Sequence, residues 1–161
     1  LQFRGDGEKE IRLTALSWEK LDHEAPEVAA FGKSRIDGKV SYLATVRGDG
    51  FPRIHPVTAI VGESRCFMFA EPGSSKVKDF RSNDHFCLHC GMSDSSGSSG
   101  EFQITGEVIQ IEDDQIRAEA ESICSYRPAG RYLLYELKIS EAIATAYRGG
   151  RPNRKRWTAS G

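Results

Sequence analysis

The spacing of hydrophobic and polar residues changes from a helical period to a β period near residue 40. Before that point, apolar residues recur at helical spacing over residues 16–34, which predicts helical structure. Ser17 is suited to cap the first helix, and Pro26 to the first turn of a second one, where its missing N–H is not needed. After that point, apolar and polar residues alternate over 40–46, which predicts a half-buried strand.

Most of the remaining chain is predicted to be antiparallel β structure. Gly48-Asp49-Gly50 supplies the residues of a hairpin turn, so residues 40–70 are interpreted as a three-strand meander. A short helix is expected over 75–81 and another after Asp113, and the Ser/Gly-rich stretch 93–100 is expected to be a loop. The strands predicted after the first are residues 53–61, 66–70, 85–90, 102–108 and 133–147.

These elements favour a mainly β fold in a single domain. About six or seven antiparallel strands with a few short helices are typical of a small β-barrel and not of a parallel α/β sheet. The 161 residues suffice for one domain with its own core. Within the single domain 1–161 we expect an N-terminal helical arm (1–35), a barrel (36–147) and a basic C-terminal segment (148–161).

The composition excludes several classes of function. The formal net charge is -1, so the chain has no overall field to hold nucleic acid or an anionic membrane. No stretch reaches the ~18 apolar residues that a membrane-spanning helix needs, and residues 1–10 are too polar for a secretory signal. Four cysteines are too few for a disulfide scaffold. We therefore expect a reduced, cytoplasmic protein.

Cys87 and Cys90 form a C-x-x-C pair, the spacing found in many metal sites. Zinc needs four ligands, however, and no second pair stands at matching spacing. On a strand, the two side chains would point to opposite faces and lie roughly 10 Å apart, too far for a disulfide. We interpret them as ordinary strand cysteines and expect them to hold no metal.

Two neighbouring segments are suited to bind an anion. Residues 73–76 (Gly-Ser-Ser-Lys) lie between a strand and a helix, where free N–H groups, hydroxyls and a lysine suit a phosphate, although serine at a helix start is often only a cap. Arg53, His55 and Val57 share one face of an earlier strand, and Pro56 indicates an edge or a bulge there. Alone, Arg53 fits a solvated charge and His55 a hydrogen-bonded barrel histidine; the two segments together favour a ligand site.

The C-terminus carries a basic run without acidic residues. Two interpretations stay open: a solvated basic tail, which such runs often are, and a lid over an anionic ligand. Tyr147 and Trp157 bracket the run, which favours packing against a flat surface. The basic residues are Arg148, Arg151, Arg154, Lys155 and Arg156.

Three segments, in order, resemble the pyridoxamine 5′-phosphate oxidase-like, FMN-binding split-barrel family. Residues 44–57 resemble its opening hairpin, residues 69–78 its phosphate-binding strand end and helix, and residues 101–108 the later strand that closes over the flavin. The similarity spans about residues 18–157. It implies an antiparallel split β-barrel and a homodimer with two FMN sites at the subunit interface.

The resemblance also implies roles for single residues. Arg53, Ser75 and Lys76 would bind the FMN phosphate, with Ser75 in place of an arginine in the best-known members. Tyr147 stands in place of a flavin-contacting tryptophan. Asn153, near Arg151, replaces the substrate-binding histidine of the oxidases, which argues against pyridoxamine phosphate as the substrate. Further cofactor contacts are expected at Ile54, His55, Val57, Thr58, Phe69, Ala70 and Gln103, or at Glu101 if the register differs.

The resemblance implies an FMN-dependent oxidoreductase that acts on a small-molecule redox substrate, with the hard chemistry supplied by the cofactor. Because the fold does not settle the reaction, two alternatives stay open. The same barrel would suit a deazaflavin coenzyme or haem, for which His55 or His89 is available. It would also suit a non-catalytic flavin-binding or stress-response module.

Overall fold

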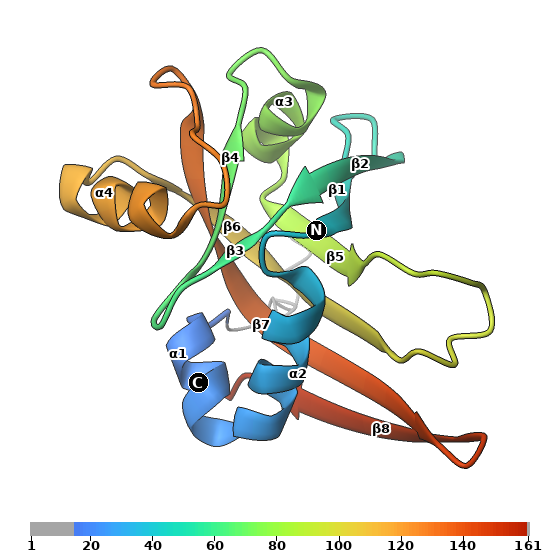
Figure 1. Cartoon of the computed structure of the whole chain (residues 1–161). Helices are drawn as coiled ribbons and strands as arrows, with labels where there is room; N and C mark the ends of the chain where they lie inside the picture. Colours follow the sequence, from blue (N-terminus) through green and yellow to red (C-terminus); the bar gives the residue numbers. More distant parts are fainter. Residues whose placement is uncertain (1–14, 161) are drawn as a thin grey trace, which may run out of the picture.

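The computed structural model describes residues 15–160, which form one eight-stranded sheet and four helices (Figure 1). The helices are α1 (Trp18–Glu24), α2 (Pro26–Ile36), α3 (Ser75–Ser82) and α4 (Asp114–Ile123). The strands are β1 (Val40–Val46), β2 (Pro52–Thr58), β3 (Ile60–Val61), β4 (Cys66–Ala70), β5 (His85–Cys90), β6 (Glu101–Ile111), β7 (Leu133–Arg148) and β8 (Arg151–Thr158). The predicted mainly β class is confirmed.

The predicted helix starts are confirmed by their caps. The Ser17 side chain accepts a hydrogen bond from the backbone N–H of Lys20 at 3.4 Å, and Pro26 is the first residue of α2. Asp113 caps α4 by accepting hydrogen bonds from two backbone N–H groups of its first turn. Helices α1 and α2 pack together at one end of the sheet (Figure 1), and the core that they cover is continuous with that of the barrel.

The chain itself joins the two ends of the sheet. The strand order is β2-β1-β5-β6-β7-β4-β3, with β8 paired to β7. The end strands β2 and β3 are consecutive in the chain and only Ala59, which is fully buried, lies between them. The sequence predicted one strand over 53–61. The structure divides it because β2 pairs with β1 while β3 pairs with β4. The sheet therefore closes into a barrel that is split between β2 and β4.

The basic C-terminal segment is a strand and not an irregular tail, although its residues 151–156 are solvent-exposed. Residues 151–158 pair with β7 from Glu141 to Arg148, which adds an eighth strand to the six or seven predicted. Gly149 and Gly150 form the connecting turn with φ values of +57° and +75°, which glycine adopts without strain. The side chain of Trp157 is buried in the core, and its indole N–H donates to Glu24 at 3.1 Å.

Other boundaries agree with the sequence prediction within a residue or two, except that β6 continues three residues beyond the predicted end at residue 108. The loop 93–100 connects β5 to β6 without regular structure. No helix among residues 15–160 is long and apolar enough to span a membrane. The polar stretch 1–10, interpreted above as unsuited to a secretory signal, lies outside the described residues.

A β-bulge interrupts the pairing of β6 with β7. Thr105 lies opposite Glu141 but Gly106 lies opposite Ile139, so Ser140 has no partner on β6. At this point the backbones approach so closely that a Cβ on Gly106 would lie 1.8 Å from the carbonyl oxygen of Lys138. Because the obstacle is backbone and not a flexible side chain, glycine is the residue that the geometry permits.

Replacing Gly106 with alanine should lower the free energy of unfolding by about 1–3 kcal/mol or more, because the strands must separate to admit the methyl group. Denaturant unfolding monitored by circular dichroism measures this loss. Gly130→Ala is the matched control, since a Cβ at Gly130 meets no atom within 4 Å. Equal effects of the two substitutions would contradict the close approach of β6 and β7.

Candidate functional site

A hollow of about 260 Å³ opens at the split between β2 and β4, beside the start of α3. Four of its lining residues, Val57, Thr58, Phe69 and Lys76, were expected from the sequence to contact a cofactor. The full lining is Val40, Pro56, Val57, Thr58, Phe69, Lys76 and Tyr126. The wall is thus partly apolar, with a single ammonium group at one side, as a flat ring that carries an anionic chain requires.

Side chains of β2 alternate between two faces, as predicted. Arg53 and His55 face β1 and α3: the Arg53 Nε lies 3.1 Å from a carboxylate oxygen of Asp79, and the His55 Nε2 lies 3.1 Å from the Thr45 hydroxyl. Ile54 points to the opposite face and is 69% exposed. β2 pairs with β1 alone among the described strands, so the edge position inferred from Pro56 is confirmed.

Asp79 on α3 connects this helix to both strands of the first hairpin. Its carboxylate is 2% exposed, accepts a hydrogen bond from the Thr45 hydroxyl at 2.6 Å and pairs with Arg53. The Thr45 hydroxyl has one proton, which it gives to Asp79, so the His55 Nε2–H must be the donor to Thr45. The sequence analysis missed Asp79 and Thr45. The signal for Asp79 was a carboxylate on the inward face of a short helix, next to Val77 and Phe80.

The start of α3 has the features of an anion site. Ser74 is the N-cap residue, Ser75 is the first helical residue, and the first turn carries no acidic side chain. The Ser74 hydroxyl is buried and has no hydrogen-bond partner within the described residues, whereas the Arg53 Nε is held in its ion pair with Asp79. Buried polar atoms are nearly always paired, so an unpaired hydroxyl at a helix N-terminus fits a bound phosphate.

Charges around the site oppose protonation of His55. Burial lowers the pKa of His55 below its usual 6.5, the neighbouring ammonium of Lys76 and the guanidinium of Arg53 lower it further, and the carboxylate of Asp79 acts in the opposite direction. His55 is therefore neutral at pH 7. Burial also lowers the pKa of Lys76. Burial is the largest cause of both shifts, so these groups are poorly solvated, and an anionic ligand beside Lys76 would stabilise its charge.

Arg53 lines a second hollow of about 350 Å³ on the far side of Asp79, together with Lys78 and Ser82. The structure thus brings Arg53, His55, Val57, Thr58, Phe69 and Lys76 into one region, but places Arg53 and Lys76 in adjoining hollows. Asp79 lies in the wall of the second hollow, and the charges of both Lys76 and Arg53 lower the pKa of His55. Ala70 is buried at the end of β4, next to Phe69.

Two residues that were expected to contact the cofactor lie on strands away from the hollow at the split. Gln103 is on β6, which β1 and β5 separate from β2, and Tyr147 is near the end of β7, beside the loop residue Gly97. Neither lines the hollow at the split. Gln103 belongs to the outer face of the sheet, in a cross-strand row with Tyr42, His89 and Ile143.

Tyr126 lines the hollow but was not expected from the sequence. It lies in the connection between α4 and β7, where no periodic pattern assigns a direction to a side chain. Burial raises the pKa of its hydroxyl to about 12, so the group stays protonated and is available as a hydrogen-bond donor to a ligand.

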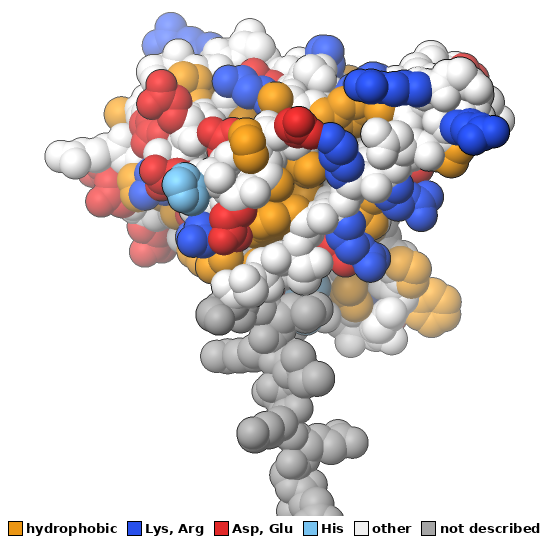
Figure 2. All heavy atoms as spheres, turned by 90° about the horizontal axis from the view of Figure 1, so that it is seen from below, with side chains coloured by type: hydrophobic (Ala, Val, Ile, Leu, Met, Phe, Trp, Pro, Cys, Tyr) orange, Lys and Arg blue, Asp and Glu red, His pale blue; other side chains and the backbone are white. Residues whose placement is uncertain are grey.

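The C-terminal strand directs Asn153 and Lys155 toward α2 and not toward the split. Both line a hollow of about 280 Å³ with Glu27 and Phe31, and Lys155 pairs with Glu27. Figure 2 shows Lys and Arg side chains gathered over the half of this face where the β7–β8 hairpin lies. Within one chain, the basic segment 151–156 therefore does not form the lid over an anionic ligand that was the second interpretation above.

The C-x-x-C pair is divided between two environments. Cys90 is buried and its sulfur accepts a hydrogen bond from the backbone N–H of Phe102, whereas Cys87 is half-buried on the other face. All four cysteines are free. The opposite orientations predicted from strand alternation are confirmed.

The fold and this site define a split-barrel protein whose opening carries cationic side chains. Residues 26–146 match the family model described as pyridoxamine 5′-phosphate oxidase, and the chain belongs to this family. Solved structures with a similar fold include one described as a heme binding protein and one described as an F420 reductase. A search of curated protein sequences found no match.

Solved structures agree with the fold. PhzG from Burkholderia lata 383, in complex with tetrahydrophenazine-1-carboxylic acid, is 14% identical, covers 88% of this chain and 87% of its own, and has a TM-score of 0.61. A heme binding protein from Mycobacterium smegmatis is 17% identical, covers 80% of this chain and 57% of its own, and also has a TM-score of 0.61. An F420 reductase is 13% identical, covers 68% of this chain and 94% of its own, and has a TM-score of 0.53. These identities show the shared fold alone.

The charge cluster predicts how the pKa of His55 responds to its neighbours. Lys76→Met should raise that pKa toward 6.5, because one repelling charge is removed, and Asp79→Asn should lower it, because the attracting charge is lost. Titration of the imidazole C–H signals by NMR measures both shifts, and His23, which is exposed on α1, is the internal reference. A wild-type pKa at or above 6.5 would contradict the geometry.

Proposed function

We propose that the protein is an FMN-dependent oxidoreductase that acts on a small-molecule redox substrate. The observation that carries the proposal is the Ser74 hydroxyl, a buried donor without a partner among the described residues, at the start of α3, where Lys76 lines a partly apolar hollow. A phosphate fits this donor and a flat ring fits the hollow. Bound FMN would supply hydride and electron transfer, and the protein would supply binding and orientation.

Different residues around the hollow would contact different parts of FMN. Ser75 and Lys76 would contact the phosphate, and Arg53 would add its positive charge from the adjoining hollow. Val57, Thr58 and Phe69 would pack against the ring and ribityl chain, with Ala70 offering backbone contacts at the end of β4. The neutral His55 leaves its Nδ1 free as an acceptor, because its Nε2–H is committed to Thr45.

FMN is better supported than haem. An axial imidazole must offer an unprotonated nitrogen to the iron. His55 has such a nitrogen in its Nδ1, but neither His55 nor His89 lines the hollow at the split, and His89 places one ring nitrogen 2.7 Å from the carbonyl oxygen of Cys90 and the other 3.4 Å from Glu101. A deazaflavin coenzyme is the second candidate, because the basic residues of β8 would suit its polyanionic tail.

Pyridoxamine phosphate is not the proposed substrate. Asn153 replaces the histidine of the oxidases, and it faces α2 beside Glu27 instead of the hollow at the split. Arg148 and Lys155 also line the hollow beside α2, but Lys155 is paired with Glu27. Steady-state turnover with a nicotinamide donor distinguishes an oxidoreductase from a non-catalytic flavin-binding or stress-response module.

We propose further that the protein is a homodimer formed through the outer face of β1 and β2. Val40, Tyr42 and Ile54 share this face and are 56%, 46% and 69% exposed. Three large apolar side chains on one sheet face are a typical interface signal. Val40 also lines the hollow at the split, so a second copy on this face would cover the hollow and would be placed to contribute Gln103 and Tyr147.

The phosphate assignment predicts a difference between two flavins. FMN and riboflavin share the ring, and only FMN carries the phosphate. Hydrogen bonds to charged groups contribute roughly 1.5–3 kcal/mol each, and about 1.4 kcal/mol is tenfold in affinity. Lys76→Ala should weaken FMN about ten- to a hundredfold and leave riboflavin nearly unchanged. Arg53→Ala should act in the same direction, because the buried carboxylate of Asp79 then lacks its partner and repels the phosphate.

Titration of apo-protein with both flavins, followed by flavin fluorescence, measures these changes. Lys78→Ala is the matched control: it removes the same charge two residues further along α3, from a side chain that lines the second hollow only. Equal weakening of FMN and riboflavin by Lys76→Ala would show that Lys76 supports the fold, and that the phosphate lies elsewhere.

The interface proposal predicts a specific way to separate the subunits. Light scattering of the wild type should give twice the 17.9 kDa of one chain. Ile54→Asp should give the monomer mass with an unchanged circular dichroism spectrum, because the side chain is already exposed within one chain. Ile123→Asp, on the exposed side of α4, should stay dimeric. A monomeric wild type that still binds FMN would overturn the proposal.

A further inference from the structure

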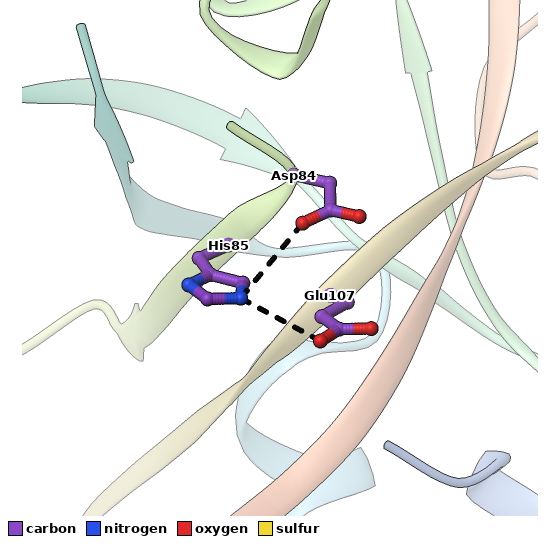
Figure 3. A group of neighbouring side chains, drawn as sticks. All are labelled: Asp84, His85 and Glu107. Atoms are coloured by element: carbon purple, nitrogen blue, oxygen red, sulfur yellow. Dashed lines mark ion pairs between the residues drawn. The ribbon is translucent and has the colours of Figure 1, made fainter. Parts of the chain in front are cut away.

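A second group of ligand-type side chains lies away from the hollow at the split. Asp84, His85 and Glu107 converge where β5 begins beside β6 (Figure 3). The His85 Nε2 points between the two carboxylates, 3.9 Å from the Asp84 Oδ1 and 3.5 Å from the Glu107 Oε1. One ligand atom from each of the three residues lies within 4.8 Å of the others.

Backbone pairing holds the three residues in place. His85 and Glu107 are direct cross-strand partners, so their Cβ atoms are neighbours on the same face. The carbonyl oxygen of Asp84 accepts a hydrogen bond from the N–H of Val108 at 2.9 Å, and the N–H of His85 donates to the Asn83 side chain at 2.9 Å. The convergence therefore rests on strand geometry and does not need a flexible loop.

The group borders a hollow of about 130 Å³. His85 and Glu107 line it together with Thr105 and Ser140. Ser140 is the residue that the β-bulge leaves without a partner on β6, and it is 6% exposed. Bulges re-aim side chains next to functional sites. The bulge thus places a polar side chain, Ser140, at the border of this hollow.

We propose that Asp84, His85 and Glu107 bind a divalent transition metal ion, with a water molecule as the fourth ligand on the side of the hollow. Metal–ligand bonds of 2.0–2.2 Å place the ligands of a tetrahedral Zn²⁺ site roughly 3.4 Å apart. The 3.5 and 3.9 Å separations need only small side-chain rotations to reach this spacing. The Thr105 and Ser140 hydroxyls lie on the side where the metal-bound water would need hydrogen-bond partners.

The donor set and the surrounding charge favour this class of metal. One imidazole nitrogen and two carboxylate oxygens suit Zn²⁺ better than Mg²⁺ or Ca²⁺, which prefer oxygen ligands alone. Two carboxylates also balance the charge of a divalent ion. Lys138 on β7 is the cross-strand partner of Glu107; its ammonium lies 3.7 Å from Glu136, which reduces its repulsion of a metal.

Calorimetric titration of the full chain with ZnCl₂, after dialysis against a chelator, tests the proposal. We expect one Zn²⁺ per chain. His85→Ala and Glu107→Gln should each weaken binding by at least the 10- to 100-fold that loss of a metal's outer-shell partner costs. His89→Ala is the matched control, because His89 is a strand histidine with a single carboxylate, Glu101, at 3.4 Å. Co²⁺ in place of Zn²⁺ should give the visible absorption of a tetrahedral site.

Three results would overturn the proposal. The first is no binding at millimolar Zn²⁺. The second is binding that His85→Ala and Glu107→Gln leave unchanged, which would indicate adventitious binding only. The third is an equal loss in His89→Ala. Circular dichroism of each variant checks folding; the substituted side chains of His85 and Glu107 are 60% and 33% exposed. The flavin titrations are independent of this site, so either proposal can fail alone.

Discussion

The direct connection of β2 to β3 is the constraint on which the architecture and the site depend. Ala59 alone separates two strands that pair at opposite ends of the sheet. The sheet must curl until its ends meet. No ladder joins β2 to β4, because β2 pairs with β1, and β4 pairs with β3 on one edge and with β7 on the other. The split that results leaves backbone and side chains of both strands facing a hollow, and α3 follows β4 directly to cover one end of it.

Asp79 balances the charges of this opening. A carboxylate that is 2% exposed would be costly without partners, and its ion pair with Arg53 and its bond from Thr45 supply them. The same contacts fix α3 against the first hairpin, so the start of the helix is held rigidly beside β2. Lys76 has no such partner in the cluster, and burial lowers its pKa. The opening therefore keeps one desolvated cation for a ligand while its other cation is held by the protein.

Local sequence signals predicted nearly all the elements because caps, glycine turns and period-two alternation act over a few residues. Ser17, Pro26 and Asp113 mark helix starts, and all three are confirmed. The break at Ala59 and the pairing of β8 were missed because both depend on distant partners: nothing in residues 53–61 reveals that the strand changes neighbours, and the basic run of β8 has strand character only against β7. Likewise, the family resemblance pointed to Arg53 and Lys76, but Asp79, Thr45 and Tyr126 join the site only through the tertiary packing.

The central claim is that the split between β2 and β4 holds a phosphorylated flavin. The most direct measurement is mass spectrometry of the small molecule released when the purified, ligand-bound protein is denatured. The account predicts the mass of FMN at about one molecule per chain. Release of riboflavin without the phosphate, of a deazaflavin coenzyme or of haem would contradict it, because none of these is the phosphorylated flavin that the hollow and the start of α3 are proposed to hold.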